Sequence, residues 1–257
     1  MTAHPLSITE RTLLQKIASD TGFDVERPAE GPWLAFDSSR TSMRLWLSNV
    51  GTTLIVVAFS QHKVVDALKG GASPVTNPLP SGAVGAFGAT SLSAAQVLIQ
   101  RAGVFSRTLP DELLHRFQRR AGGMPETTEA ERLARQRIGQ DVFREGLLEL
   151  AAGQCMITGI TVPEVLRASH IKPWAECETD AERLDVHNGL LLAAHLDALF
   201  DKHLISVADD GTVLVSARIT PADRSRLGLE STSRVRGLTP GHRVFLAGHR
   251  AKLVPGV

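Results

Sequence analysis

Residues 155–211 constrain the fold more than any other part of the chain. The apolar run LLLAA in this segment follows Asn188-Gly189, a residue pair typical of turns, and leads directly into HLDALFD. If HLDALFDKH is helical, Asp197 and Asp201 lie one above the other on one face, because residues four apart are neighbours on a helix. The segment therefore predicts an apolar run that ends in a helix carrying two adjacent carboxylates.

Two carboxylates at this spacing, with His195 beside them, make an oxygen-rich site for a hard divalent cation such as Mg²⁺ or Mn²⁺. The same pair near a helix start could instead merely complement the helix dipole. An isolated His170 precedes the sequence IKPW, and a lone histidine is more often a structural residue than a catalytic one. The residues taken singly leave both interpretations open.

Composition places the chain among ordinary globular proteins, with 257 residues, 43% hydrophobic and 21% charged. This length allows one large domain or two smaller ones, and we expect two. The longest apolar run, residues 54–59, is far shorter than the roughly 20 residues needed to cross a bilayer. The N-terminus has no apolar signal core, so we expect a cytoplasmic protein. Two cysteines, Cys155 and Cys177, cannot form a four-cysteine zinc site.

The first part of the chain mixes helical and strand patterns. A capping-box spacing predicts a helix over residues 7–20, and residues 33–59 contain short apolar runs around a turn, which predict a hairpin. Residues 70–91 have the composition of a loop or linker, in which one short strand is allowed. Helices are predicted from 93 to about 102 and from 110 to about 120.

A glycine pair at 122–123, followed by Pro125, ends this pattern. We therefore place the domain boundary there, with an N-terminal mixed α/β domain over 1–122 and a second domain over 124–257. Thr127 or Thr128 is expected to cap a long helix that opens the second domain. The predicted fold class is α+β.

Charge is distributed unevenly within the second domain. Asp plus Glu outnumber Lys plus Arg ten to four in residues 151–217, whereas Lys plus Arg outnumber Asp plus Glu eight to two in residues 218–257. An acidic segment often holds a cation and a basic one a polyanion. Alternatively, the two segments neutralise each other across the surface of the domain.

The order and spacing of the whole set resemble the HNH nuclease family. The matching elements are CMITG, SHIKPW and NGLLLAAHLDALFDKHLIS, and the preceding RIGQDVFREGLLEL resembles the helix that leads into the restriction-type variant. The resemblance covers about residues 132–215 and nothing in residues 1–120. It implies a C-terminal HNH domain of the ββα-metal fold, with flanking helices, in which two short strands, a loop and a helix surround one divalent ion.

The resemblance also implies roles for single residues. His170 matches the general base that deprotonates the attacking water, and Asn188 matches the asparagine that ties the loop and orients the base. His195 occupies the final histidine by motif order. The spacing from Asn188 instead selects Asp197 and Asp201 as the metal ligands, so all three remain candidates, Asp197 first.

The chain departs from the family pattern at Ser169, where many members carry an aspartate or histidine ligand. The cysteines that often bind zinc in this family are also missing, which implies that Cys155 and Cys177 are core residues. The implied cofactor is one divalent metal ion, Mg²⁺ or Mn²⁺. A weakened catalytic site is the alternative that Ser169 leaves open.

DNA is the expected partner. Candidate phosphate contacts are lysines near the motif and arginines of the basic tail, namely Lys172, Lys202, Arg224, Arg226, Arg234, Arg236, Arg243 and Arg250. The sequence predicts a metal-dependent DNA endonuclease of restriction or phage defence, and the alternative is a catalytically weak DNA-binding or sensor protein that keeps the HNH scaffold. The N-terminal domain is expected to recognise a DNA feature, a partner or a signal. A homodimer is left open, and no membrane partner is expected.

Overall fold

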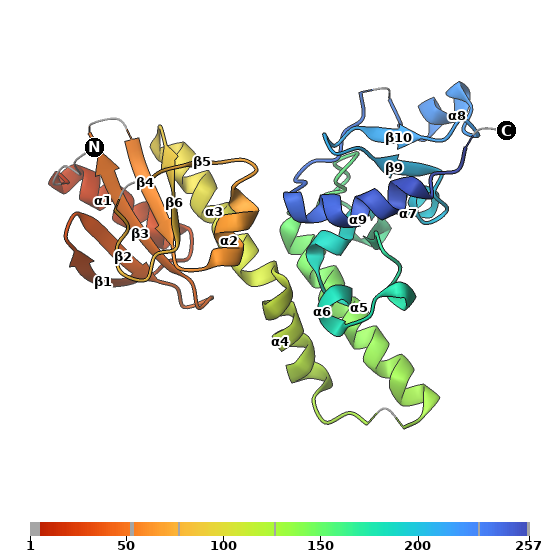
Figure 1. The fold of residues 1–257 in the computed structure, drawn as a ribbon, viewed down its shortest axis with the longest axis horizontal. Helices are drawn as coiled ribbons and strands as arrows, with labels where there is room; N and C mark the ends of the chain where they lie inside the picture. Colours follow the sequence, from red (N-terminus) through yellow and green to blue (C-terminus); the bar gives the residue numbers. More distant parts are fainter. Residues whose placement is uncertain (1–5, 52–53, 77, 126, 231, 256–257) are drawn as a thin grey trace. The chain divides into compact units, whose positions relative to one another are not determined.

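The computed structural model describes residues 6–51, 54–76, 78–125, 127–230 and 232–255. It divides into two compact units, residues 1–107 and 108–257, which are described separately (Figure 1). The sequence placed the domain boundary after residue 122, whereas the structural division falls after Arg107. Helix α4 (Pro110–Ala121) belongs to the second unit because it packs on α5 (Glu129–Leu150), where Arg120 and Glu145 form an ion pair of 2.7 Å.

The N-terminal unit contains one antiparallel sheet in the order β1-β2-β3-β4-β6-β5. The predicted hairpin is confirmed, because Val50 pairs with Leu54 across the β3–β4 turn. The strands are β1 (Val25–Glu30), β2 (Trp33–Asp37), β3 (Arg44–Val50), β4 (Leu54–Phe59), β5 (Ser73–Pro74) and β6 (Gly85–Ala89).

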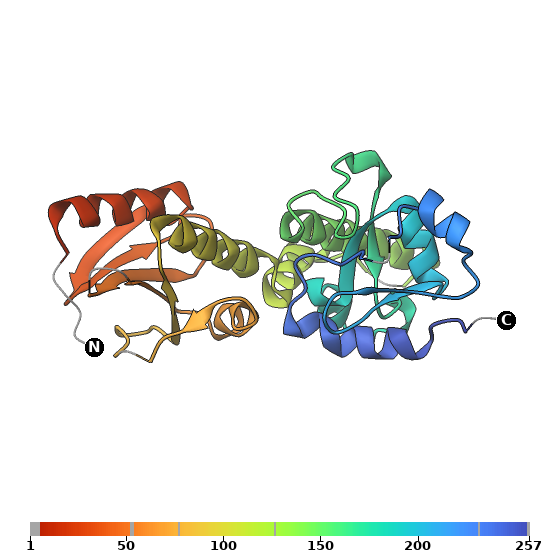
Figure 2. The same cartoon turned by 90° about the horizontal axis from the view of Figure 1, so that it is seen from above.

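The described residues of this unit also form the helices α1 (Ile8–Asp20), α2 (His62–Leu68) and α3 (Leu92–Thr108). The predicted capping box is present, since the Ser7 hydroxyl accepts from the Glu10 N–H and the Glu10 side chain accepts from the Ser7 N–H. Figure 2 shows α1 and α3 on the same side of the sheet. Helix α3 continues well beyond the predicted end at about residue 102.

Strands β5 and β6 both lie in residues 70–91, where the sequence predicted a loop with room for one short strand. The glycines of β6 are required by packing, because a Cβ on Gly85 would meet Val65 at 2.6 Å and one on Gly88 would meet Leu54 at 3.0 Å. The glycine content therefore reflects crowding between strand and neighbours rather than a flexible connection.

The C-terminal unit is built around two antiparallel strands and the helix that follows them. Strand β7 (Leu166–His170) pairs with β8 (Gly189–Ala193), and β8 leads directly into α7 (Ala194–Asp201), as the apolar run and its helical continuation predicted. The other elements are α6 (Asp180–Arg183), β9 (Ile205–Val207), β10 (Val213–Val215), α8 (Pro221–Arg226) and α9 (Pro240–Ala251), with short 3₁₀ turns between.

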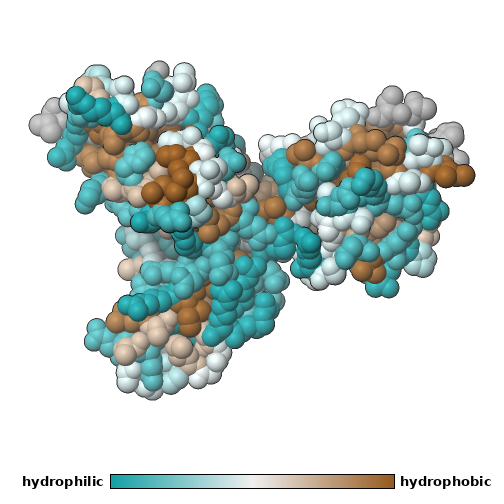
Figure 3. All heavy atoms as spheres, turned by 180° about the vertical axis from the view of Figure 1, so that it is seen from behind, coloured by the Kyte–Doolittle hydropathy of each residue, from teal (hydrophilic) through white to brown (hydrophobic). Residues whose placement is uncertain are grey.

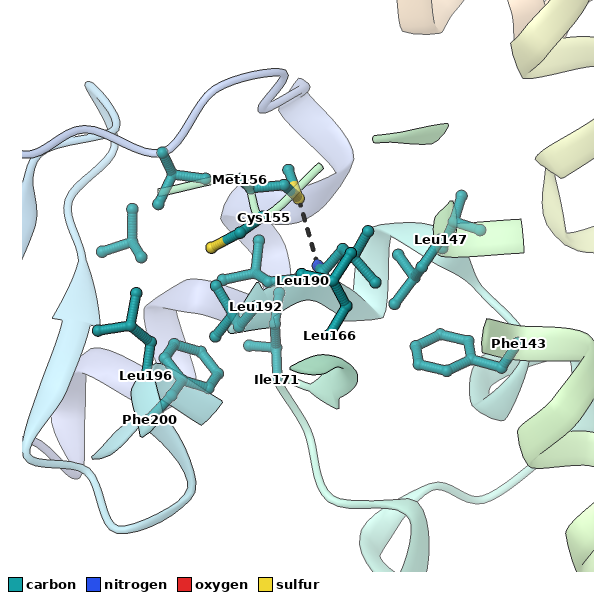
Figure 4. Close-up of a cluster of buried hydrophobic side chains, with 14 of the residues drawn as sticks. Phe143, Leu147, Cys155, Met156, Leu166, Ile171, Leu190, Leu192, Leu196 and Phe200 are labelled. Atoms are coloured by element: carbon teal, nitrogen blue, oxygen red, sulfur yellow. Dashed lines mark hydrogen bonds between the residues drawn. The ribbon is translucent and has the colours of Figure 1, made fainter. Parts of the chain in front are cut away.

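A single buried core holds these elements together. Figure 4 shows side chains of α5, β7, β8 and α7 meeting in it, and the Leu191 N–H donates to the Met156 sulfur at 3.4 Å. Cys155 and Cys177 are both free and buried, as expected of core residues. The mixture of helices and antiparallel sheets confirms the α+β class.

No helix in the described part of the chain is long and apolar enough to cross a membrane. The face drawn in Figure 3 is mostly hydrophilic and carries apolar patches on both units.

Candidate active site

A cleft of about 480 Å³ opens where the end of β7 meets α7. Its titratable lining side chains are Arg167, His170, Asp197, Asp201, His203 and His249, and Trp174 forms part of its apolar wall. The cleft therefore brings together His170 and both aspartates that the sequence singled out. His195, which is exposed on α7, does not line it.

His170 is fixed at the end of β7 by three contacts. Its ring stacks on Phe143 with centroids 3.8 Å apart, and Trp174 lies edge-on at 5.5 Å. The ring Nε2 lies 2.9 Å from the Arg183 carbonyl, which can only accept, so Nε2 carries the proton and Nδ1 keeps the lone pair. Burial lowers the pKa of His170 despite this hydrogen bond, and the neutral imidazole is the form that accepts a proton.

Asn188 holds the loop that follows His170. Its side chain is fully buried, and its Oδ1 accepts from the Lys172 N–H at 2.7 Å while its Nδ2 donates to the Lys172 carbonyl at 3.2 Å. The Asn188 carbonyl also accepts from the Ile171 N–H. These bonds fix the backbone immediately after His170 against the start of β8.

Asp197 and Asp201 lie one turn apart on α7 and share the cleft. Among the described residues neither carboxylate has a hydrogen bond or a salt bridge. Burial and the charge of Asp197 raise the pKa of Asp201. Two carboxylates that form no hydrogen bond or salt bridge within the described ranges thus line the same cleft as the His170 ring.

Residues 155–208 match the family model described as HNH endonuclease. This segment is an HNH domain. No curated protein matches the chain closely enough to be counted as a relative. The domain indicates nuclease activity on DNA, and the match includes β7, β8 and α7 but ends before the basic tail.

HNH nucleases generally use a divalent metal ion, and the donor chemistry of this cleft fits one. Asp197 and Asp201 supply hard oxygen donors, and the hydroxyl of Ser169, buried in the same cleft, has no hydrogen-bond partner among the residues that the structure describes. Among the described residues, however, no group of three or more His, Cys, Asp or Glu side chains is arranged as a complete set of metal ligands.

The lysines and arginines predicted to contact phosphates differ in the partners that their side chains have in the structure. Lys172 pairs with Glu182 at 2.7 Å, and Arg226, Arg234 and Arg250 pair with nearby aspartates. The guanidinium of Arg224 faces the carbonyls of residues 215, 216 and 219, and that of Arg236 donates to the Cys155 carbonyl. Lys202 and Arg243 are exposed and have no partner within the described ranges.

Several cleft residues were missed by sequence reasoning. Phe143 and Arg183 fix the His170 ring, and Arg167, His203 and His249 line the cleft. A signal existed for His203, which stands two residues after Asp201 within the motif. None existed for His249, which reaches the cleft only because α9 packs beside β9.

Proposed function

We propose that this protein is a divalent-metal-dependent DNA endonuclease that hydrolyses phosphodiester bonds in its HNH cleft. The observation that carries the proposal is the shared cleft of His170, Asp197 and Asp201 within the segment that matches the HNH family. Hydrolysis needs an activated water and neutralisation of the charge that grows on the phosphate. In the cleft, His170 would activate the water, and Asp197 and Asp201 would hold a cation that neutralises the charge on the phosphate.

His170 is the proposed general base. Its Nε2–H is committed to the Arg183 carbonyl, so Nδ1 is the nitrogen that would accept the proton of water. Stacking on Phe143 restrains the ring, and the Asn188 side chain holds the backbone of Lys172 in the loop that follows it. Asp197 and Asp201 would hold one Mg²⁺ or Mn²⁺ ion, which when bound supplies positive charge to the phosphate and the leaving oxygen.

We further propose that the enzyme serves restriction or phage defence and that the N-terminal unit selects the substrate. A nuclease without a specificity element would endanger the genome of its own cell. This need supports the proposal, and so does the N-terminal unit, residues 1–107, none of which lies in the HNH match.

A catalytically weak DNA-binding or sensor protein is the second candidate. It is favoured by the neutral Ser169 beside His170 and by the incomplete set of metal ligands among the described residues.

Plasmid cleavage separates the two candidates. The purified chain is incubated with supercoiled plasmid in Mg²⁺, Mn²⁺ or EDTA, beside His170→Ala and the control His115→Ala, which changes an exposed histidine on α4. We expect metal-dependent nicking that falls at least about 100-fold in His170→Ala, since a general base contributes about 10² to 10⁴ in rate. Retention of more than a tenth of the rate would exclude His170 as the base. Intact plasmid with every metal, and intact modified phage DNA, would support the second candidate.

A further inference from the structure

His203 lies in the cleft in a backbone conformation that ordinarily favours glycine. Its φ is +52°, and apart from Ala152 it is the one non-glycine position among the described residues with positive φ. A residue of this kind is held in a strained conformation by its surroundings, and such strain collects at functional sites. The backbone is fixed on both sides, because the His203 N–H donates to the Phe200 carbonyl and its carbonyl accepts from the Val254 N–H.

The ring of His203 is oriented by a buried histidine. Nδ1 of His203 lies 3.1 Å from Nε2 of His249, and that same Nε2 lies 3.1 Å from the Phe200 carbonyl. His249 is 4% exposed, stacks on Phe200 at 3.8 Å, and its Nδ1 lies 2.9 Å from the Ser206 hydroxyl. The His203 side chain thus contacts His249, whose two ring nitrogens both have hydrogen-bond partners.

The hydrogen bonds determine which nitrogen of His203 carries the proton. A carbonyl can only accept, so His249 Nε2 bears a hydrogen, and Ser206 donates to His249 Nδ1. His203 Nδ1 is therefore an acceptor that shares this N–H with the Phe200 carbonyl. In the neutral ring the proton of His203 resides on Nε2, which makes no hydrogen bond to any described residue and is not among the buried atoms without a partner.

We propose that His203 is a substrate-binding residue of the HNH cleft, whose Nε2–H donates a hydrogen bond to a non-bridging oxygen of the scissile phosphodiester. The ring lines the same cleft as His170, Asp197 and Asp201, so a phosphate bound in that cleft would have both histidines in its surroundings. His249 and Ser206 are positioning residues, which act through the orientation of the His203 ring. The inference rests on the proposed endonuclease function.

The test compares three substitutions at position 203. His203→Asn suits positive φ, and its shorter amide reaches only the position of Nδ1, so no donor remains at the position of Nε2. His203→Gln places an amide N–H near the original Nε2. His203→Gly relieves the backbone strain altogether. We measure kcat and KM for plasmid and for the small diester bis(p-nitrophenyl) phosphate in Mg²⁺ and Mn²⁺, together with urea unfolding. His115→Asn, at an exposed site on α4, is the control.

We expect His203→Asn and His203→Gly to lower kcat about 10- to 100-fold on both substrates, as for one lost hydrogen bond to a charged group, while stability is unchanged or higher. His203→Gln should recover most of the rate. Ser206→Ala should lower the rate of the wild type and have no further effect in His203→Asn. Unchanged kcat, or a loss matched by destabilisation, would overturn the proposal. A change confined to KM for plasmid would mean contact with a flanking phosphate and would also overturn it.

A binding measurement keeps the two proposals separate. We follow a fluorescent DNA duplex by anisotropy in EDTA, where no cleavage occurs. If the wild type never cuts DNA, the endonuclease proposal fails, but His203→Asn should still weaken duplex binding about 10-fold relative to His115→Asn. Equal affinity of these two variants would overturn the phosphate contact of His203 itself.

Discussion

Acid should destabilise the C-terminal unit through a buried histidine, His242, that does not line the cleft. His242 on α9 is fully buried, and its Nδ1 accepts from the Thr239 N–H at 3.1 Å, which completes the cap of that helix. The ring of His187 lies edge-on at 5.2 Å. Burial, and next the neighbouring His187, lower the pKa of His242 to about 3.

The sign follows from where the proton binds. The unfolded chain binds it with a pKa of about 6.5, whereas the folded chain keeps His242 neutral down to about 3. The contribution of the neutral ring to stability is therefore complete above pH 6.5 and is lost as pH falls below it. The loss approaches about 1.4 kcal/mol per pH unit and amounts to about 2 kcal/mol at pH 5.

The perturbation that isolates this effect is His242→Asn. The asparagine Oδ1 can take the place of Nδ1 as acceptor for the Thr239 N–H, but it does not titrate. The smaller side chain leaves a cavity, which lowers stability equally at every pH. We therefore expect the unfolding free energies of wild type and variant to converge between pH 6.5 and 4, with the difference changing by about 1.4 kcal/mol per pH unit.

The assay uses the two cysteines of the chain. Cys155 and Cys177 are both buried in the C-terminal unit, so pulse labelling with a pyridyl disulfide in urea reports the opening of that unit alone. The matched control is His115→Asn, at an exposed histidine in the same unit. If the curves for wild type and His242→Asn stay parallel from pH 7 to pH 4, the buried ring is not the source of acid sensitivity.

Four further outcomes are expected. Asp197→Ala should require a higher metal concentration and recover part of its activity there, as measured by metal titration of plasmid nicking, whereas a loss independent of metal would contradict a ligand role. The acid limb of the rate profile should lie below pH 6.5, because burial lowers the pKa of His170 and the base must be neutral; a limb above 6.5 would contradict this. Gly189→Ala should lower stability by about 1–3 kcal/mol in urea unfolding because its Cβ would collide with Phe143 and Leu147, whereas Gly248→Ala, where space is open, should not. A fragment of residues 108–257 should bind DNA in a salt-dependent manner by anisotropy but lose preference among substrates, and retained preference would exclude the N-terminal unit as the reader.

The sequence predicted a structural feature correctly where the residues that form the feature lie close together in the chain. The cap of α1 at Ser7 and the pairing of Asp197 with Asp201 on α7 depend on three- and four-residue spacings, which a sequence displays directly. One short strand was allowed within residues 70–91, but the bounds of β6 were not predicted, because its glycines accommodate side chains of α2 and β4 that only the folded chain brings close. The orientation of the His170 ring depends on Phe143 and on the Arg183 carbonyl. Every residue type carries a backbone carbonyl, so the sequence could not indicate this hydrogen bond.

The charge of the basic tail illustrates a further limit of sequence reasoning. Both interpretations of the acidic and basic segments were open, and the structure contains ion pairs between them, from Arg234 to Asp210 and from Arg250 to Asp209. The free energy needed to break these two ion pairs differs, because the side chain of Arg234 is 61% exposed and that of Arg250 only 23%. An exposed pair contributes little, so a phosphate could displace Asp210 from Arg234 at small loss, whereas Arg250 also donates to the Val207 carbonyl and is held by two partners. The part of the tail that remains available to DNA is thus decided by exposure and by hydrogen bonds to the backbone, neither of which net charge reveals.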